Sequence, residues 1–169
     1  MVISDSSTLI HLSDIGRLGL LRELFGQITI PPAVWREVVE EGQGRAGAAE
    51  VEAARKSGWI VLLPPSNEPL SFSLKRDLDE GEAEVIALAL EQRAGLILLD
   101  ESDARNLASR YGLKKTGAIG VLMRARKEGK VASLRVELDR LRNQSGFWIE
   151  DGLYQQALDA VGETAEGRD

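Results

Sequence analysis

The strongest constraint on the fold is an alternation along the chain between short apolar runs and stretches with helical periodicity. The apolar runs predict four short strands, at residues 1–4, 28–30, 59–63 and 96–99. The segments between them carry apolar residues at helical spacing. Strands that alternate with helices in this way are joined as parallel βαβ units. We therefore predict an α/β fold, a three-layer sandwich in which helices flank a central, mostly parallel sheet.

Helices are expected between the strands and after the last strand. One or two helices fill residues 6–25. The others are expected near residues 33–41, 48–56, 80–93, 101–111, 117–128, 133–143 and 151–161. Pro31 and Pro32 end the second strand and suit the first turn of the helix that follows. The segment PPSNEP is expected to be a loop, and a polar tail follows Gly162.

The chain has no cysteine and only one histidine, His11. The lack of cysteine excludes disulfides, thiolate zinc sites and thiol catalysis. A single histidine leaves little material for a histidine-rich metal site or a Ser-His-Asp triad. The first residues lack the pattern of a signal peptide, and no apolar run approaches the ~20 residues of a membrane span. We therefore expect a cytoplasmic protein that does not associate with membranes.

Two aspartates each follow a predicted strand directly. Asp5 follows the first strand, and Asp100 follows the strand at 96–99. In a parallel sheet the carboxyl ends of the strands lie along one edge, where ligands bind. The two carboxylates are therefore expected to converge at that edge, although they are far apart along the chain.

Glu82 begins the helix at 80–93 and points along its apolar stripe. On a wheel at ~100° per residue, the apolar residues of this helix centre close to the direction of Glu82. A buried, unpaired carboxylate is costly, and a divalent cation removes that cost. Alternatively, Glu82 satisfies free amide groups at the helix N-terminus, and the two roles are compatible. A fourth acid is expected in VWREVVEE, but the pattern does not choose among Glu37, Glu40 and Glu41.

Three or four carboxylates at one edge repel one another, so a cation is expected among them. Oxygen ligands without cysteine favour Mg²⁺ or Mn²⁺ over zinc or copper. A hard cation at a sheet edge suits phosphoryl chemistry, because it activates water and neutralises the phosphate. Ser6 and Ser7, next to Asp5, are candidate caps of the first helix, whose free amide groups are also a phosphate site.

The charges are distributed unevenly. The net charge is −6, yet the segment from Arg105 to Arg142 has eleven Lys or Arg and three Asp or Glu. This is a balance of +8, which leaves −14 for the rest of the chain. The asymmetry indicates a basic face beside an acidic site. The alternative is that solvated helices carry these charges without binding a ligand.

Four segments that contain the acids resemble the PIN-domain family. VISDSSTLI resembles the family's first strand with its Asp, and LILLDESDAR resembles the strand that ends in Asp100. IPPAVWREVV resembles the segment that carries the second acid, which singles out Glu37. GEAEVIALAL resembles the helix that carries the third acid, at Glu82. LDEGEAEVIALA, LLDESDAR and TGAIGVLMRARKEG also resemble a PIN subgroup related to VapC-type toxins.

The resemblance covers roughly residues 1–130 and implies a PIN-like nuclease domain at 1–145. Residues 146–169 would add a C-terminal helix and the polar tail of the same domain. The implied activity is metal-dependent hydrolysis of RNA. The catalytic residues and ligands of Mg²⁺ or Mn²⁺ would then be Asp5, Glu37, Glu82 and Asp100.

Two departures from the family pattern affect these acids. The third acid is Glu82, where many relatives have Asp, so its side chain is longer by one methylene. Many relatives carry a second Asp soon after the one that matches Asp100. This chain has Glu101 and Asp103 there. Either could replace the missing acid, and Asp103 is the preferred further metal ligand.

The resemblance also implies binding partners. RNA would be the substrate, and the candidate contacts to its backbone are Arg105, Arg110, Lys114 and Lys115. Thr116 and Gly117 are expected in a loop beside the site. A homodimer is implied, for which the apolar stripe of Leu134, Leu138 and Leu141 offers a surface. In toxin members the resemblance implies a small antitoxin protein.

Two other functions fit parts of the sequence. A phosphatase-like or receiver-like α/β domain would be phosphorylated on Asp5 and would recruit Lys114 or Lys115. A degenerate PIN domain would bind RNA or protein without catalysis, although the presence of all four acids argues against it.

Overall fold

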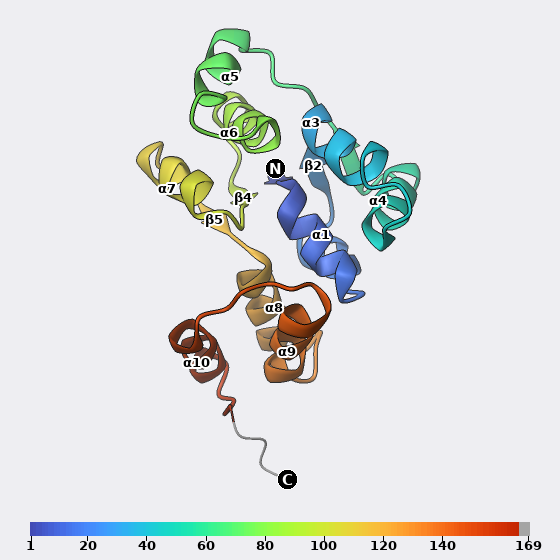
Figure 1. The fold of residues 1–169 in the computed structure, drawn as a ribbon, viewed down its shortest axis with the longest axis vertical. Coiled ribbons are helices and arrows are strands. Elements are labelled where there is room, and N and C mark those ends of the chain that lie inside the picture. The colour runs from blue at the N-terminus through green and yellow to red at the C-terminus, as the bar shows by residue number, and fades with distance from the viewer. Residues whose placement is uncertain (166–169) are drawn as a thin grey trace.

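The computed structural model describes residues 1–165, and a five-stranded parallel sheet lies at its centre (Figure 1). Across the sheet the order is β3 (Ile60–Leu62), β2 (Ile28–Ile30), β1 (Val2–Ser4), β4 (Leu96–Leu98) and β5 (Lys115–Thr116). Every neighbouring pair is parallel. Ile3 of β1 is in register with Thr29 on one side and Ile97 on the other. The predicted α/β fold with a parallel sheet is confirmed.

One strand was not predicted. β5 contains only Lys115 and Thr116, which carry no apolar signal. Backbone hydrogen bonds define it: Ile97 N–H donates to Lys114 C=O at 2.9 Å, and Leu99 N–H donates to Thr116 C=O at 2.8 Å. Thr116 therefore lies in the sheet rather than in the expected loop.

Helices connect the strands along the described chain. They are α1 (Ser6–Asp14), α2 (Gly19–Phe25), α3 (Pro32–Trp35), the π-helix η1 (Arg36–Glu40), α4 (Ala46–Lys56), α5 (Glu68–Leu74), α6 (Glu80–Gln92), α7 (Ser102–Arg110), α8 (Ala118–Lys127), α9 (Leu134–Gln144) and α10 (Asp151–Ala160). The predicted helices are present with bounds within about two residues. α5 was missed. It begins in the predicted loop, where the Asn67 side chain accepts a hydrogen bond from Leu70 N–H at 3.0 Å.

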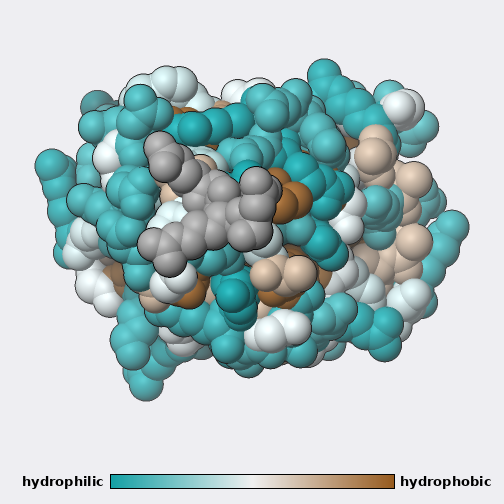
Figure 2. All heavy atoms as spheres, turned by 90° about the horizontal axis from the view of Figure 1, so that it is seen from below, coloured by the Kyte–Doolittle hydropathy of each residue, from teal (hydrophilic) through white to brown (hydrophobic). Residues whose placement is uncertain are grey.

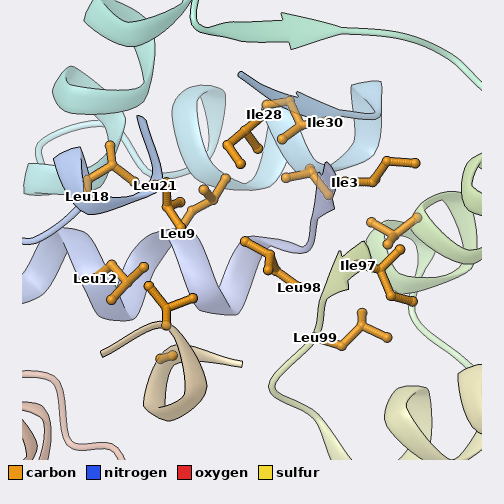
Figure 3. Packing of buried hydrophobic residues seen from close by; sticks show 14 of the residues in the cluster. Ile3, Leu9, Leu12, Leu18, Leu21, Ile28, Ile30, Ile97, Leu98 and Leu99 are labelled. Carbon is orange, nitrogen blue, oxygen red and sulfur yellow. The ribbon is translucent and has the colours of Figure 1, made fainter. Parts of the chain in front are cut away.

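The strands lie between two layers of helices (Figure 1). α6 packs against β1 and contacts α3, α5 and α7, whereas α1 contacts α4, α8 and α9. The strands read as continuous apolar runs because both faces of a parallel sheet are covered. Figure 3 shows the resulting core, in which the isoleucines and leucines of β1, β2 and β4 pack near Leu9 and Leu12 of α1. Seen from the end where α9 and α10 lie, the surface is mostly hydrophilic (Figure 2).

The C-terminal helices are tied to the rest of the molecule through Glu163. Its carboxylate accepts hydrogen bonds from Leu134 N–H at 2.7 Å, Arg135 N–H at 2.9 Å and Arg126 Nε at 2.7 Å. It thus caps the free amide groups at the start of α9. The chain just after Gly162 is therefore anchored, not a frayed tail as the sequence suggested. Residues 166–169, the rest of that predicted tail, lie outside the described residues.

The apolar stripe late in the chain is not a free surface. Leu134, Leu138 and Leu141 are fully buried in the core of the protomer itself. They cannot supply the dimer interface that the sequence suggested, so the homodimer stays a prediction without this support. Within residues 1–165, no helix is both long enough and apolar enough to cross a membrane.

Candidate active site

Asp5 lies at the junction between β1 and α1 and is buried, with 2% of its surface exposed. One carboxylate oxygen, Oδ1, accepts a hydrogen bond from Thr8 N–H at 2.9 Å and so caps α1. The other, Oδ2, accepts from Asp100 N–H at 3.1 Å. Asp5 is therefore the helix cap that the sequence assigned to Ser6 or Ser7. With both oxygens engaged and little surface exposed, Asp5 is also poorly placed to be phosphorylated.

Asp100 follows β4 and faces the start of α8. Its Oδ1 accepts a hydrogen bond from Ala118 N–H at 2.9 Å, and its Oδ2 accepts from Thr8 Oγ1 at 3.0 Å. Gly117 makes this approach possible. A β-carbon there would collide with Asp100 Oδ1 and lie 3.2 Å from the Leu99 carbonyl oxygen. Thr8 thus bridges the two aspartates, donating to Asp5 through its amide and to Asp100 through its hydroxyl.

The sheet topology places these two aspartates side by side. β1 and β4 are neighbours, and the chain runs from β1 to β2 on one side and from β4 to β5 on the other. Such a reversal of strand order opens a crevice at the carboxyl ends of the two strands, where α/β proteins bind ligands. Asp5 and Asp100 lie at this crevice, as the sequence predicted.

Glu82 and Asp79 form a capping box at the start of α6. Glu82 N–H donates to Asp79 Oδ1 at 2.8 Å, and Asp79 N–H donates to Glu82 Oε2 at 3.4 Å. The alternative in which Glu82 satisfies helix amides is thus present. Yet Glu82 is only 9% exposed and lines a small cavity with Asp5. Glu82 therefore caps the helix and also lies beside Asp5 at the carboxyl edge of the sheet.

Glu37 reaches the same cavity from η1. Its Oε2 accepts a hydrogen bond from Ser6 Oγ at 2.7 Å. The cavity is lined by Asp5, Ser6, Ser7, Glu37, Asp79 and Glu82. Gly81 allows the side chains to approach, because a β-carbon there would lie 3.4 Å from Glu37 Oε2 and 3.6 Å from Ser6 Oγ. A single helix was predicted where α3 passes into η1. π-Helical turns often occur at functional sites.

The electrostatics of the cavity reflect crowded negative charge. Burial, together with the charge of Asp100, raises the pKa of Asp5 to about 7, against the opposing hydrogen bonds from Thr8 and Asp100. Burial, together with the charges of Asp79, Glu101 and Glu37, raises the pKa of Glu82 to about 7. Both carboxylates therefore lack a sufficient positive counter-charge from the protein. Strongly perturbed acids of this kind mark functional sites.

A family model described as a PIN domain matches residues 1–163. The chain belongs to the PIN-domain family. No curated protein matches it. The PIN domain is generally a nuclease fold, and nucleases of this family typically use divalent metal ions. The family predicted from the four acid-bearing segments is confirmed, whereas membership of the VapC-like subgroup stays a prediction.

The donor set of this PIN domain fits a hard divalent cation in its chemistry. Carboxylate oxygens are the preferred ligands of such ions, and the raised pKa values of Asp5 and Glu82 show charge that a cation would neutralise. As the side chains stand, residues 1–165 contain no three acidic or histidine side chains grouped closely enough to hold an ion. Binding of an ion would therefore require these side chains to move closer together.

The remaining predicted acids lie elsewhere. Asp103 is in the first turn of α7 and borders a separate hollow with Asp77 and Arg110, not the acidic cavity. The charge of Glu101 contributes to the raised pKa of Glu82. Glu40, on the same turn as Glu37, does not line the cavity.

Sequence reasoning missed Thr8 and Asp79. Thr8 looked like an ordinary residue of the first helix, and only the fold shows that it bridges Asp5 and Asp100. Asp79 had a usable signal, because an acid three residues before Glu82 is the pattern of a capping box. That pattern could have placed Asp79 at the cavity.

The basic residues of the 105–142 segment lie in several different surroundings. Arg105 and Lys115 line a cleft that begins at Asp100, whereas Arg110 borders the hollow with Asp103. Lys114 is exposed before β5. Several other cations of the 105–142 segment pair with acids of the protein itself. These are Arg124 with Glu128, Arg126 with Glu163, Arg135 with Asp139, Arg140 with Glu137, Arg142 with Asp151 and Lys130 with Glu23. Many of the positive charges in the 105–142 segment are therefore paired with acids of the same protein.

Proposed function

We propose that this protein is an endoribonuclease that uses Mg²⁺ or Mn²⁺ to hydrolyse RNA phosphodiesters. The observation that carries the proposal is the gathering of carboxylates from four separate segments at the carboxyl edge of the sheet. Asp5 follows β1, Asp100 follows β4, Glu37 is in η1, and Glu82 is in α6. Burial, together with the charges of neighbouring acids, raises the pKa values of Asp5 and Glu82 to about 7.

These four acids are the proposed ligands. A divalent ion held by them would activate a water molecule and neutralise the charge that develops on the phosphate. Thr8 fixes the two aspartates relative to each other, and the α8 amide of Ala118 orients Asp100. Arg105 and Lys115 supply positive charge beside Asp100 for the RNA backbone. The protein thus offers an anionic metal site next to cationic phosphate contacts.

Cleavage of a mixed RNA pool with Mg²⁺ or Mn²⁺, compared with EDTA, tests the proposal. Asp5→Asn, Glu82→Gln and Asp100→Asn should each abolish metal-dependent cleavage while the protein stays folded. Glu40→Gln is the matched control, because Glu40 is an exposed acid outside the cavity. Wild-type rates in any two of these three variants would refute the assignment.

A second candidate is a degenerate PIN domain that binds RNA or protein without catalysis. It is favoured by one observation, the lack among residues 1–165 of three acids grouped as metal ligands. Calorimetric titration with Mn²⁺ separates the two functions. The nuclease should show binding heat that disappears in Asp5→Asn, whereas a degenerate module should show no heat that depends on the carboxylates.

The dependence of RNA affinity on salt concentration tests the proposed path of the RNA backbone. Phosphate contacts give an affinity that falls with salt, with a slope of roughly 0.7 per neutralised phosphate on single strands. Replacing Arg105, Lys114 and Lys115 by neutral residues should weaken RNA binding and flatten that slope, while Mn²⁺ affinity stays nearly unchanged. An unchanged slope would remove these residues from the RNA path.

A toxin role is the most specific part of the proposal. It is supported by the likeness of residues 78–89 and 116–129 to VapC-type sequences. A small protein encoded beside this one that binds it and stops cleavage would support the role. Cleavage that proceeds unchanged in the presence of such a protein would argue against it.

A further inference from the structure

An open cleft leads away from Asp100 toward the C-terminal helices. Its volume is about 430 Å³. Its lining includes Asp100, Arg105 and Lys115, which belong to the segments around β4, α7 and β5, and Trp148 and Leu153, which lie just before α10 and on it. The cleft is therefore continuous with the proposed active site, yet most of its wall takes no part in the proposed metal site.

Trp148 is the most exposed large hydrophobic side chain among the described residues, with 81% of its surface exposed. Exposing an aromatic ring of this size forgoes the gain from burying it. Leu153, on α10 in the same cleft, is 46% exposed. An aromatic ring that borders a cleft but is left uncovered has the features of a ligand contact.

The segment that carries Trp148 is held in place on both sides. Phe147 packs edge-to-face on His11, with ring centroids 4.6 Å apart, and its amide donates to the Leu141 carbonyl at 3.1 Å. Ile149 is 4% exposed, and its carbonyl accepts a hydrogen bond from Arg142 Nη2 at 2.7 Å. The neighbours of Trp148 are therefore anchored, which presents its ring outward on a fixed backbone.

Positive charge lies at the end of the cleft next to Asp100. Arg105 Nη1 donates to the Leu99 carbonyl at 2.9 Å, which holds the guanidinium beside the end of β4. The Lys115 ammonium contacts Ser109 Oγ. Glu150, the N-cap of α10, also lines the cleft. This polarity favours phosphate near Arg105 and Lys115 and an uncharged group near Trp148 and Leu153.

We infer that Trp148 is a stacking platform for an unpaired base of single-stranded RNA whose backbone passes Arg105 and Lys115 to reach Asp100. The inference rests on the proposed function, because RNA is the substrate in both. An aromatic face beside cationic groups is the usual means of binding single strands without reading their sequence. A base in a duplex has its faces covered by its neighbours, so this platform selects unpaired RNA.

The test is RNA binding measured in EDTA, so that it does not depend on cleavage. The probes are a short single-stranded RNA of mixed sequence, the same strand in a duplex, and an abasic ribose-phosphate chain of equal length. Trp148→Ala should weaken binding of the single strand roughly tenfold, within the range of base stacking on aromatic residues. Its binding of the abasic chain should not change. Trp148→Phe should restore most of the affinity, because a phenyl ring can still stack.

Two controls accompany the variants. Phe72→Ala removes another exposed aromatic ring, 74% exposed on α5, which lies at the opposite end of the molecule from α10 (Figure 1). It should leave binding unchanged. Intrinsic fluorescence gives a second readout. RNA should quench the wild-type protein more than Trp148→Phe, which retains Trp35 and Trp59.

The outcomes separate this inference from the proposed function. Single-strand affinity unchanged in Trp148→Ala would overturn the inference, even if the protein cleaves RNA. If Trp148→Ala leaves RNA binding unchanged but lowers the mass seen by light scattering, the platform is also overturned, and the cleft is a contact between copies. Binding that depends on Trp148 without any metal-dependent cleavage would support the platform and refute the nuclease.

Discussion

Replacing Asp5 with Asn should change how the stability of the metal-free protein depends on pH. Asp5 is buried beside Asp100, and its pKa is raised from 3.8 to about 7 in the folded protein. A carboxyl group with a higher pKa in the folded than in the unfolded chain favours folding while it holds its proton. That contribution is lost as the pH rises through about 7. Wild-type protein in EDTA should therefore become less stable between pH 5 and pH 8.

The size of the effect follows from the raised pKa. One group that binds a proton only in the folded state changes the free energy of unfolding by about 1.4 kcal/mol per pH unit. Between pH 5 and a pKa of about 7, the change is about 3 kcal/mol for Asp5. Asparagine does not titrate, but its NH₂ group cannot accept the hydrogen bond from Asp100 N–H. The loss of that bond costs about 1–2 kcal/mol.

The proton-linked loss in wild type and the lost hydrogen bond in Asp5→Asn together predict that the two curves of stability against pH cross. At pH 4, where the proton-linked contribution of Asp5 is still nearly complete, Asp5→Asn should be less stable than wild type by about 1–2 kcal/mol because of the lost hydrogen bond. At pH 8 it should be equally stable or more stable, because the buried charge is gone. Urea unfolding followed by tryptophan fluorescence in EDTA at four pH values measures this, with Glu40→Gln as the control. Parallel stability curves for wild type and Asp5→Asn would refute the idea that Asp5 holds a proton near neutral pH.

Three further predictions concern the site and the assembly. Glu37→Gln should lower cleavage at least tenfold more than Glu40→Gln, since only Glu37 lines the cavity; equal rates would show that the wrong acid was chosen. Gly117→Ala should destabilise the protein by about 1–3 kcal/mol, in the range of overpacking, and impair cleavage, because the added methyl group collides with Asp100. Wild-type stability and rate would contradict that geometry. A homodimer is expected by light scattering at micromolar concentration, and a monomer mass would dismiss it.

The parts of the fold that the sequence predicted correctly depend on local pattern. β1 and β4 are apolar runs, and a parallel sheet brings their carboxyl ends together whatever separates them along the chain. The location of Asp5 and Asp100 at the carboxyl edge of the sheet could therefore be predicted from the sequence alone. Glu82 could be placed because it points along the apolar stripe that the helical wheel shows. For Glu37 the pattern alone left three acids open, and the family resemblance made the choice that the cavity supports.

The features that the sequence did not predict depend on contacts between distant segments. β5 is a strand only because the backbone of β4 pairs with it. The Glu84 carboxylate accepts a hydrogen bond from Ala33 N–H at 2.9 Å and so caps α3, a contact across 51 residues that no local pattern indicates. The leucines of α9 looked available for a partner, but α8 and α10 pack against that helix. An apolar stripe indicates that the helix is covered. It does not indicate whether other helices of the same protomer or a second copy of the chain cover it.

The central position of β1 has a consequence for folding kinetics. The hydrogen bond from Asp100 N–H to Asp5 spans 95 residues, and the pairing of β1 with β4 closes a loop of similar length. The chain loses the entropy of closing such a loop before the stabilising contacts between the strands can form, and this slows the pairing of parallel strands. A chain in which only the helices and other contacts between nearby residues have formed therefore contains the acids but no site. Recovery of activity during refolding should follow the slowest phase of structure formation.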